Sequence, residues 1–186
     1  MRKLTTPELN RMDIATYRIS DKIPLIIVLD DVRSMYNVGS IFRTSDAFRV
    51  EAIYICGITS CPPHPEIHKT ALGAEDSVSW QYYPTALDAI HHLHESGYHV
   101  FGVEQVEHSI KLGIDSITST IHTPDVDKEP KWAIVLGNEV KGVKQEVIDI
   151  CDACIEIPQY GTKHSLNVST AAGIVIWELQ KNFQIK

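Results

Sequence analysis

Apolar runs rich in Val and Ile recur along the chain, and amphipathic stretches with helical spacing separate them. The clearest run covers residues 23–29, a continuous apolar segment typical of a strand buried on both faces. Because predicted strands alternate with predicted helices, the sequence indicates an α/β fold with a parallel sheet flanked by helices. The other predicted strands are 52–56, 78–82, 98–103, 132–136 and 153–157, and the predicted helices are 38–48, 85–96, 144–150 and 166–183.

The chain length of 186 residues suits one compact domain with a short extension. Residues 1–22 are polar and mixed, and we expect a basic N-terminal arm or short helix there, with one domain over 23–186. The longest apolar run is far shorter than the roughly 18–20 residues that cross a bilayer. The basic start is followed by no apolar stretch, so we expect no secretory signal and a cytoplasmic protein.

The net charge of −7 is unevenly distributed along the chain. Residues 1–22 hold five Lys or Arg against three acids, whereas residues 104–130 hold two lysines against six acids. Nucleic-acid binding depends on local basic patches rather than on the total charge. An RNA-binding face that includes the N-terminal arm is therefore compatible with this acidic chain.

Two groups of side chains raise the alternative of a metal site. Cys151 and Cys154 have a zinc-like spacing. However, Cys56 ends an apolar run and Cys154 begins one, positions where a thiol acts as a small buried apolar group. The three histidines of residues 91–94 lie on a predicted surface helix with no carboxylate at a supporting spacing. We therefore expect no metal.

The first segment of chemical interest, residues 30–44, follows the first predicted strand. Asn37 is placed to cap the next helix, and Gly39 allows another group to approach the backbone closely. Arg43, expected near the exposed start of that helix, has a guanidinium whose geometry suits a phosphate. A helix cap beside a solvated arginine explains the same residues equally well.

The second segment, residues 136–143, contains two glycines five positions apart after a buried strand. Gly137 and Gly142 predict a turn that admits a flat ligand against the backbone. Glu139 has a simpler alternative, as a carboxylate favoured by the dipole at a helix start. The spacing is not that of the G-x-G-x-x-G fingerprint, which makes a Rossmann dinucleotide site improbable.

The third segment, residues 157–169, leads from a predicted strand through a glycine-containing loop into the last helix. Helix capping explains one of Ser165 and Asn167, but not why Ser, Asn and Ser alternate with apolar residues there. Open α/β sheets bind ligands in the crevice outside the carboxyl ends of their strands. We therefore expect the three segments to line one crevice.

Together the three segments resemble the signature of the SpoU/TrmH family of SPOUT RNA methyltransferases, over residues 25–178. The departures are Arg49, where the family usually has glycine, and Gln159, where methionine is common. Both lie in loops near the presumed RNA side and put substrate geometry in doubt more than chemistry. The matching residues are Asn37, Gly39 and Arg43, then Leu136, Gly137, Glu139 and Gly142, then Ile157, Pro158, Gly161, Ser165, Leu166, Asn167, Val168, Ser169, Trp177 and Glu178.

The resemblance implies a C-terminal deep trefoil knot, a homodimer, and S-adenosylmethionine as the donor that methylates a ribose 2′-hydroxyl of RNA. Short members of the family mostly modify tRNA, which slightly favours tRNA over rRNA, and the extra N-terminal RNA-binding domain of some members is not expected. The cofactor-binding residues implied are Leu136, Gly137, Asn138, Glu139, Gly142, Ile157, Leu166 and Asn167. The residues implied around the reacting centre are Asn37, Arg43, Glu139, Ser165 and Asn167.

The resemblance leaves the role of Arg43 between general base and phosphate or oxyanion binder. An arginine with a pKa above roughly 12 is a poor base at neutral pH, so we favour the second role. A catalytically silent RNA-binding member of the family is one alternative function, although all five polar positions are present. A flavodoxin-like nucleotide-binding protein is an alternative from another class, and the missing phosphate-loop residues argue against it.

Overall fold

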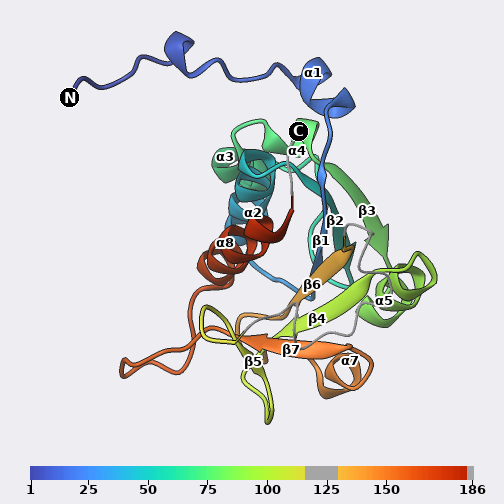
Figure 1. The fold of residues 1–186 in the computed structure, drawn as a ribbon. Coiled ribbons are helices and arrows are strands. Elements are labelled where there is room, and N and C mark those ends of the chain that lie inside the picture. The colour runs from blue at the N-terminus through green and yellow to red at the C-terminus, as the bar shows by residue number, and fades with distance from the viewer. Residues whose placement is uncertain (116–129, 184–186) are drawn as a thin grey trace.

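The computed structural model describes residues 1–115 and 130–183, and within them seven parallel strands form one sheet. Their order across the sheet is β3-β2-β1-β6-β4-β7-β5 (Figure 1). The predicted α/β class and parallel sheet are confirmed, whereas the knot remains a prediction from the resemblance. The strands are β1 (Ile23–Asp30), β2 (Val50–Cys56), β3 (Ser79–Tyr83), β4 (His99–Val103), β5 (Ile110–Lys111), β6 (Trp132–Leu136) and β7 (Ala153–Glu156).

Helices cover both faces of the sheet and enclose two apolar cores. α2, α3, α4 and α8 pack over one core, and α5 and α7 pack over the other. The α-helices are α1 (Ile14–Ile19), α2 (Met35–Ala47), α3 (Pro65–Ala71), α4 (Ala74–Ser77), α5 (Ala86–Glu95), α7 (Gln145–Ile148) and α8 (Val168–Leu179). Two 3₁₀ turns, η1 (Pro7–Leu9) and η2 (Gln180–Asn182), complete the described elements.

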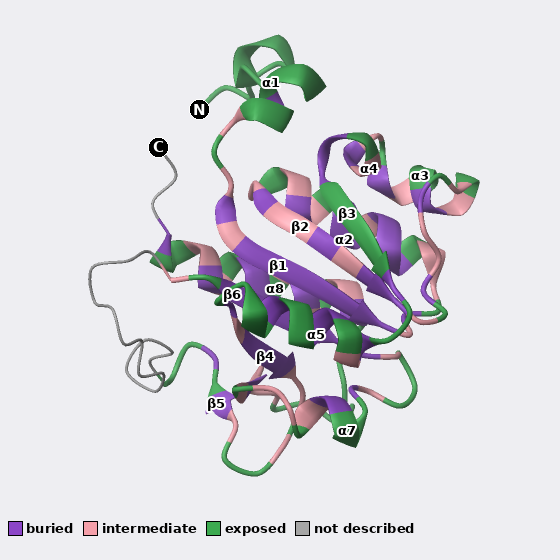
Figure 2. Cartoon of the chain, turned by 90° about the vertical axis from the view of Figure 1, so that its right-hand side faces the viewer, coloured by how far each residue is buried: buried purple, intermediate pink, exposed green. Residues whose placement is uncertain are grey.

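Strand β1 shows why the first apolar run has no polar alternation. Leu25 and Ile27 belong to the core under α2 and α8, and Ile26 and Val28 belong to the core under α5. Figure 2 shows β1 almost wholly buried along its length. A strand with helices on both sides must be apolar at consecutive positions, as the sequence predicts for residues 23–29.

Helix α2 corrects two predictions. It begins at Met35, and Ser34 is its N-cap, with the Ser34 Oγ accepting from Asn37 N at 3.3 Å. The prediction that Asn37 caps this helix is therefore wrong, since Asn37 lies within the first turn. Arg43 is well inside the helix and exposed, so the prediction that it lies near the helix start is also wrong.

The N-terminal segment is only partly separate from the domain. Residues 1–13 are exposed and extend away from the body of the molecule in Figure 1. In α1, however, the Tyr17 side chain is 5% exposed and joins the core, and the Arg18 guanidinium donates to the carbonyl of Asp76 at 2.7 Å. Only the first part of the predicted arm therefore stands clear of the domain.

Several smaller predictions can be compared with the fold. Cys56 and Cys154 are buried and free, as expected for apolar thiols. The acidic stretch 104–130 contains the short strand β5, while its residues 116–129 lie outside the described part of the chain. Within residues 1–115 and 130–183, no helix is long and apolar enough to span a membrane.

Candidate active site

A cleft of about 720 Å³ opens at the carboxyl ends of β4, β6 and β7. Its walls come from residues 103–106, 136–143, 145, 148, 155–157, 159, 164–168 and 171, which are far apart in the sequence but adjacent in the sheet. All eight residues predicted to bind the cofactor line it, as does Ser165. They are Leu136, Gly137, Asn138, Glu139, Gly142, Ile157, Leu166 and Asn167.

The loop after β6 is folded tightly onto itself. Asn138 and Gly142 exchange two backbone hydrogen bonds, with N···O distances of 3.1 and 2.8 Å. A Cβ on Gly137 would overlap the backbone of Gly142 and Val143, so any side chain at position 137 would force this loop open. Gly142 has a φ of +67°, which L-residues rarely adopt. The two glycines therefore shape the wall of the cleft, as their spacing predicts.

Three side chains from the three sequence segments form a continuous hydrogen-bonded chain, here called the Glu139–Asn37–Asn167 relay. The Nδ2 of Asn37 donates to Oε1 of Glu139 at 3.0 Å. The Nδ2 of Asn167 donates to Oδ1 of Asn37, also at 3.0 Å. The relay therefore connects α2, the loop after β6 and the start of α8, across sequence separations of 102 and 130 residues.

The two amide orientations in the relay follow from helix capping. Asn167 is the N-cap of α8, and its Oδ1 accepts from the backbone of Ser169 at 2.9 Å and of Thr170 at 3.3 Å. Because Oδ1 is used for the cap, the Nδ2 of Asn167 faces Asn37 and must donate. Asn37 in turn accepts with Oδ1 and donates with Nδ2, which requires an acceptor at Glu139. An ionised carboxylate satisfies that requirement.

The Glu139 carboxylate also holds the loop between β1 and α2. Oε2 accepts from the backbone N–H of Arg33 at 3.0 Å, and Oε1 accepts from that of Ser34 at 2.9 Å. Burial alone would raise the pKa of Glu139, but these bonds and the one from Asn37 outweigh burial and lower the pKa below its usual value. Glu139 is therefore an ionised anchor and a poor proton acceptor.

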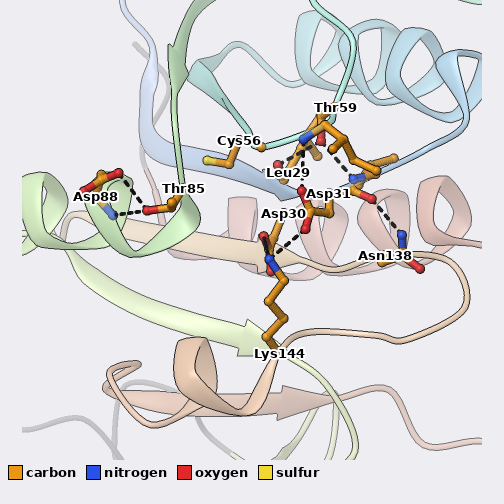
Figure 3. Close-up of polar contacts among 12 residues, drawn as sticks. Leu29, Asp30, Asp31, Cys56, Thr59, Thr85, Asp88, Asn138 and Lys144 are labelled. Atoms are coloured by element: carbon orange, nitrogen blue, oxygen red, sulfur yellow. Dashed lines mark hydrogen bonds and ion pairs between the residues drawn. The ribbon is translucent and has the colours of Figure 1, made fainter.

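An ion-pair cluster anchors the other side of the same loop (Figure 3). Lys144 Nζ lies 2.7 Å from Oδ2 of Asp31 and 3.6 Å from Oδ1 of Asp30. Asn138 Nδ2 donates to the carbonyl of Asp31 at 2.9 Å, as Figure 3 shows. Burial raises the pKa of Asp30, and Lys144 opposes that rise. No role for Asp30, Asp31 or Lys144 was predicted from the sequence.

The remaining predicted residues are placed differently. Ser165 is exposed and lines the cleft, so its hydroxyl is available to a bound molecule. Arg43 is exposed on α2 and does not line the cleft. Six residues of helix separate it from Asn37 by about 9 Å along the axis and about 120° around it. The chain thus brings Asn37, Glu139 and Asn167 into contact and leaves Arg43 outside that contact.

Sequence reasoning missed two residues on the cleft that follow β4. Glu104 Oε2 accepts from the backbone N–H of Val143 at 3.1 Å, and Gln105 Nε2 donates to the carbonyl of His164 at 3.0 Å. Both lie in the acidic stretch 104–130, in which we predicted no site residue from the sequence. Their place directly after a buried strand, at the same sheet edge as the three segments, was the signal that could have found them.

Comparisons with known proteins agree with this architecture. The 23S rRNA (guanosine-2′-O-)-methyltransferase RlmB of Vibrio vulnificus is 30% identical over 92% of this chain and 64% of its own length. RlmB of Nitrosomonas europaea is 31% identical over 83% of this chain and 55% of its own. The chain thus spans less than two thirds of the length of these curated relatives.

Solved structures of similar fold include two with 25% sequence identity to this chain. The TrmH/SpoU tRNA modifying enzyme of A. aeolicus has a TM-score of 0.74 and covers 91% of this chain and 80% of its own. The AdoMet-bound rRNA methyltransferase of Sinorhizobium meliloti has a TM-score of 0.73 and covers 92% of this chain and 60% of its own.

The sheet order and the cleft at the carboxyl ends of its strands define an α/β protein with the fold of the TrmH/SpoU enzymes. The sequence model of the SpoU rRNA Methylase family matches residues 24–177, most of the chain. The chain belongs to this family.

Proposed function

We propose that this protein transfers a methyl group from S-adenosylmethionine to a ribose 2′-hydroxyl of RNA. The observation that carries the proposal is the relay of Glu139, Asn37 and Asn167, which joins all three sequence segments at one cleft. Relatives that act on 23S rRNA and on tRNA, by their names, support the same chemistry.

The cleft fits the proposed cofactor in size and in lining. Its volume of about 720 Å³ lies within the ~300–1,000 Å³ usual for small-molecule sites. Leu136, Ile157 and Leu166 supply apolar walls, and the backbone of residues 137–142 supplies polar groups beside them. When bound, S-adenosylmethionine supplies a methyl group activated by a positively charged sulfur.

The residues of the chain have three further roles, which are to position the cleft loops, to offer a hydroxyl group and to bind the RNA. The relay positions the loops that form the cleft, and its ionised Glu139 is already engaged by three donors. Ser165 offers a hydroxyl inside the cleft. We assign to Arg43 the binding of an RNA phosphate and the stabilisation of the oxygen that becomes negative as the 2′-hydroxyl loses its proton.

The proposed assembly is a homodimer that uses α8. Ile174 and Trp177 on this helix are 38% and 54% exposed. The Trp177 ring packs edge-on against the ring of Phe48, at the end of α2, with 5.8 Å between the ring centroids. Large apolar side chains exposed together on one helix favour association with a second surface. Light scattering should return about twice the chain mass of 20.9 kDa.

For the substrate we place tRNA ahead of rRNA. The supporting observation is the A. aeolicus enzyme, named a tRNA modifying enzyme, which matches this chain with a TM-score of 0.74 at 25% identity.

The test is methyl transfer from labelled S-adenosylmethionine to purified tRNA and to rRNA, followed by mapping of the modified ribose. Gly137→Ala should abolish transfer, because its Cβ would overlap the loop backbone. Gly173→Ala, on α8 and outside the cleft, is the matched control, since a Cβ there meets nothing within 4 Å. Cofactor binding without transfer to either RNA would instead identify a silent RNA-binding member of the family.

A further inference from the structure

Glu104 lies in the middle of the cleft wall and belongs to none of the three sequence segments. In the sheet, β4 lies between β6 and β7, so the residue after β4 stands between the two loops that form the cleft (Figure 1). The Glu104 backbone N–H donates to the carbonyl of Ile155 at 3.1 Å, which continues the pairing of β4 with β7. The Glu104 side chain then lines the cleft.

The carboxylate of Glu104 is held by backbone donors on two sides. Oε2 accepts from Val143 N at 3.1 Å, and Oε1 accepts from Gln105 N at 2.9 Å. A Cβ on Gly142 would overlap the same Oε2, so the carboxylate rests directly on the glycine turn. Its negative charge is therefore fixed at the cleft wall rather than free to swing into solvent.

The other charged groups of the cleft do not cancel this charge. Three glutamates and one lysine line it, namely Glu104, Glu139, Glu156 and Lys141. Glu139 is turned to the donors of the loop before α2, and Glu156 Oε2 accepts from Ser109 Oγ at 2.7 Å. Carboxylates thus outnumber the ammonium group, and the cleft favours a cation over a neutral ligand of the same shape.

We propose that Glu104 is a specificity residue that makes the cleft bind the cationic methyl donor more tightly than the neutral product. The inference rests on the proposed function. In that reaction the 2′-oxygen forms a bond to the methyl carbon, the C–S bond breaks with its electron pair on sulfur, and the hydroxyl proton leaves to solvent. The sulfonium becomes an uncharged thioether, so the attraction to Glu104 disappears when transfer is complete.

The test uses calorimetric titration of the full-length chain with three probes. S-adenosylmethionine and sinefungin carry a positive charge at the reacting position, and S-adenosylhomocysteine carries none. Glu104→Gln keeps an oxygen that can accept from Val143 N but removes the charge. Glu107→Gln is the matched control, because Glu107 is exposed on the same loop and does not line the cleft.

Glu104→Gln should weaken both cationic probes roughly three- to tenfold, the range for one partly solvated charge pair. Binding of S-adenosylhomocysteine should stay within about twofold of wild type, and Glu107→Gln should change none of the three. Salt should reduce the preference of the wild type for the cationic probes and leave that of Glu104→Gln unchanged.

Two results would overturn the inference alone. An equal loss for all three probes would reduce Glu104 to a support of the glycine turn, and unchanged binding of all three would remove it from recognition. In both cases the wild type still binds the donor, so the proposed function stands. A wild type that binds none of the probes would overturn the proposed function and this inference together.

Discussion

The Glu139–Asn37–Asn167 relay and the loop of residues 158–166 border the same cleft, yet the chain holds them in different ways. The relay is built from side chains that hydrogen-bond to one another and to backbone N–H groups. In the loop, residues 160–166 are exposed. Among the described residues, one hydrogen bond ties the loop to another segment, from Gln105 Nε2 to the carbonyl of His164.

We infer from this difference that the relay is a scaffold of the cleft and that the loop of residues 158–166 is a surface that contacts ligands. Asn37, at the centre of the relay, is buried and hydrogen-bonded to both neighbours, and such a group is costly to disturb, so changes in the relay should act on stability and on binding together. Exposed groups on a loop with few internal bonds contribute little to stability and are free to meet a ligand. Changes at loop residues that line the cleft should therefore lower the rate of methyl transfer and leave the unfolding free energy unchanged.

Apart from the glycine turn, the largest effect is expected at Arg43, which belongs neither to the relay nor to the loop. Arg43→Ala should reduce methyl transfer by roughly 10²–10³, the range for losing one group that stabilises transition-state charge, with cofactor affinity within about twofold. Single-turnover methylation beside a cofactor titration measures both. Arg43→Lys should restore little, because a point charge does not reproduce the planar guanidinium. Recovery of the lysine variant with rising pH would instead assign Arg43 the role of a base.

The next effect breaks the relay. Asn37→Asp would place a second carboxylate where the amide now lies 3.0 Å from Glu139 Oε1, at a residue that is 9% exposed. The unfolding free energy at pH 7.5 should fall by about 2–4 kcal/mol, as for other unpaired buried charges. Because the paired carboxylates would share a proton, the deficit should shrink as pH falls.

Urea denaturation at a series of pH values checks this, with Asn10→Asp, at an exposed position, as the matched control. A deficit that does not change with pH would show that the two side chains do not interact as the relay requires.

A smaller effect tests the loop. Ser165→Ala should slow methyl transfer about tenfold, the loss of one hydrogen bond of ~1.4 kcal/mol in the transition state. Its unfolding free energy should stay within about 0.5 kcal/mol of wild type. Thr162→Ala, exposed on the same loop but outside the cleft, is the control for the rate. A clear loss of stability in Ser165→Ala would contradict the separation of loop from scaffold.

The sequence predicted the parts of this molecule that depend on local pattern. Unbroken apolar runs indicated strands covered on both faces, and glycine spacing indicated the turn after β6. Partners far apart in sequence were not predictable in this way. Nothing local distinguishes Ser34 from Asn37 as the cap of α2, and the choice depends on Glu139, 102 residues away from Asn37. Glu104 was hidden for a related reason, since its partner Val143 belongs to another strand's loop.

The smallest effect is expected at Asp30, which like the relay belongs to the scaffold of the cleft. Its carboxyl group is buried. Asp30 is 2% exposed, and its Oδ2 has no hydrogen-bond partner among the described residues. Burial raises its pKa in the folded state. The protonated form is therefore favoured by folding, and this contribution is complete below the pKa of the unfolded chain and is lost as pH rises through the raised value.

Asp30→Asn replaces the carboxyl by a neutral group of the same shape, and Lys144 keeps its closer partner Asp31 at 2.7 Å. The variant should match the wild type in acid and gain on it by about 1 kcal/mol as pH rises to 7, since the wild type alone then ionises a buried group. Urea denaturation at steps from about pH 3.5 to 7.5 covers the titration of an aspartate with a raised pKa. A variant that instead loses stability toward neutral pH would show that the attraction of Asp30 to Lys144 outweighs the cost of burying the Asp30 charge.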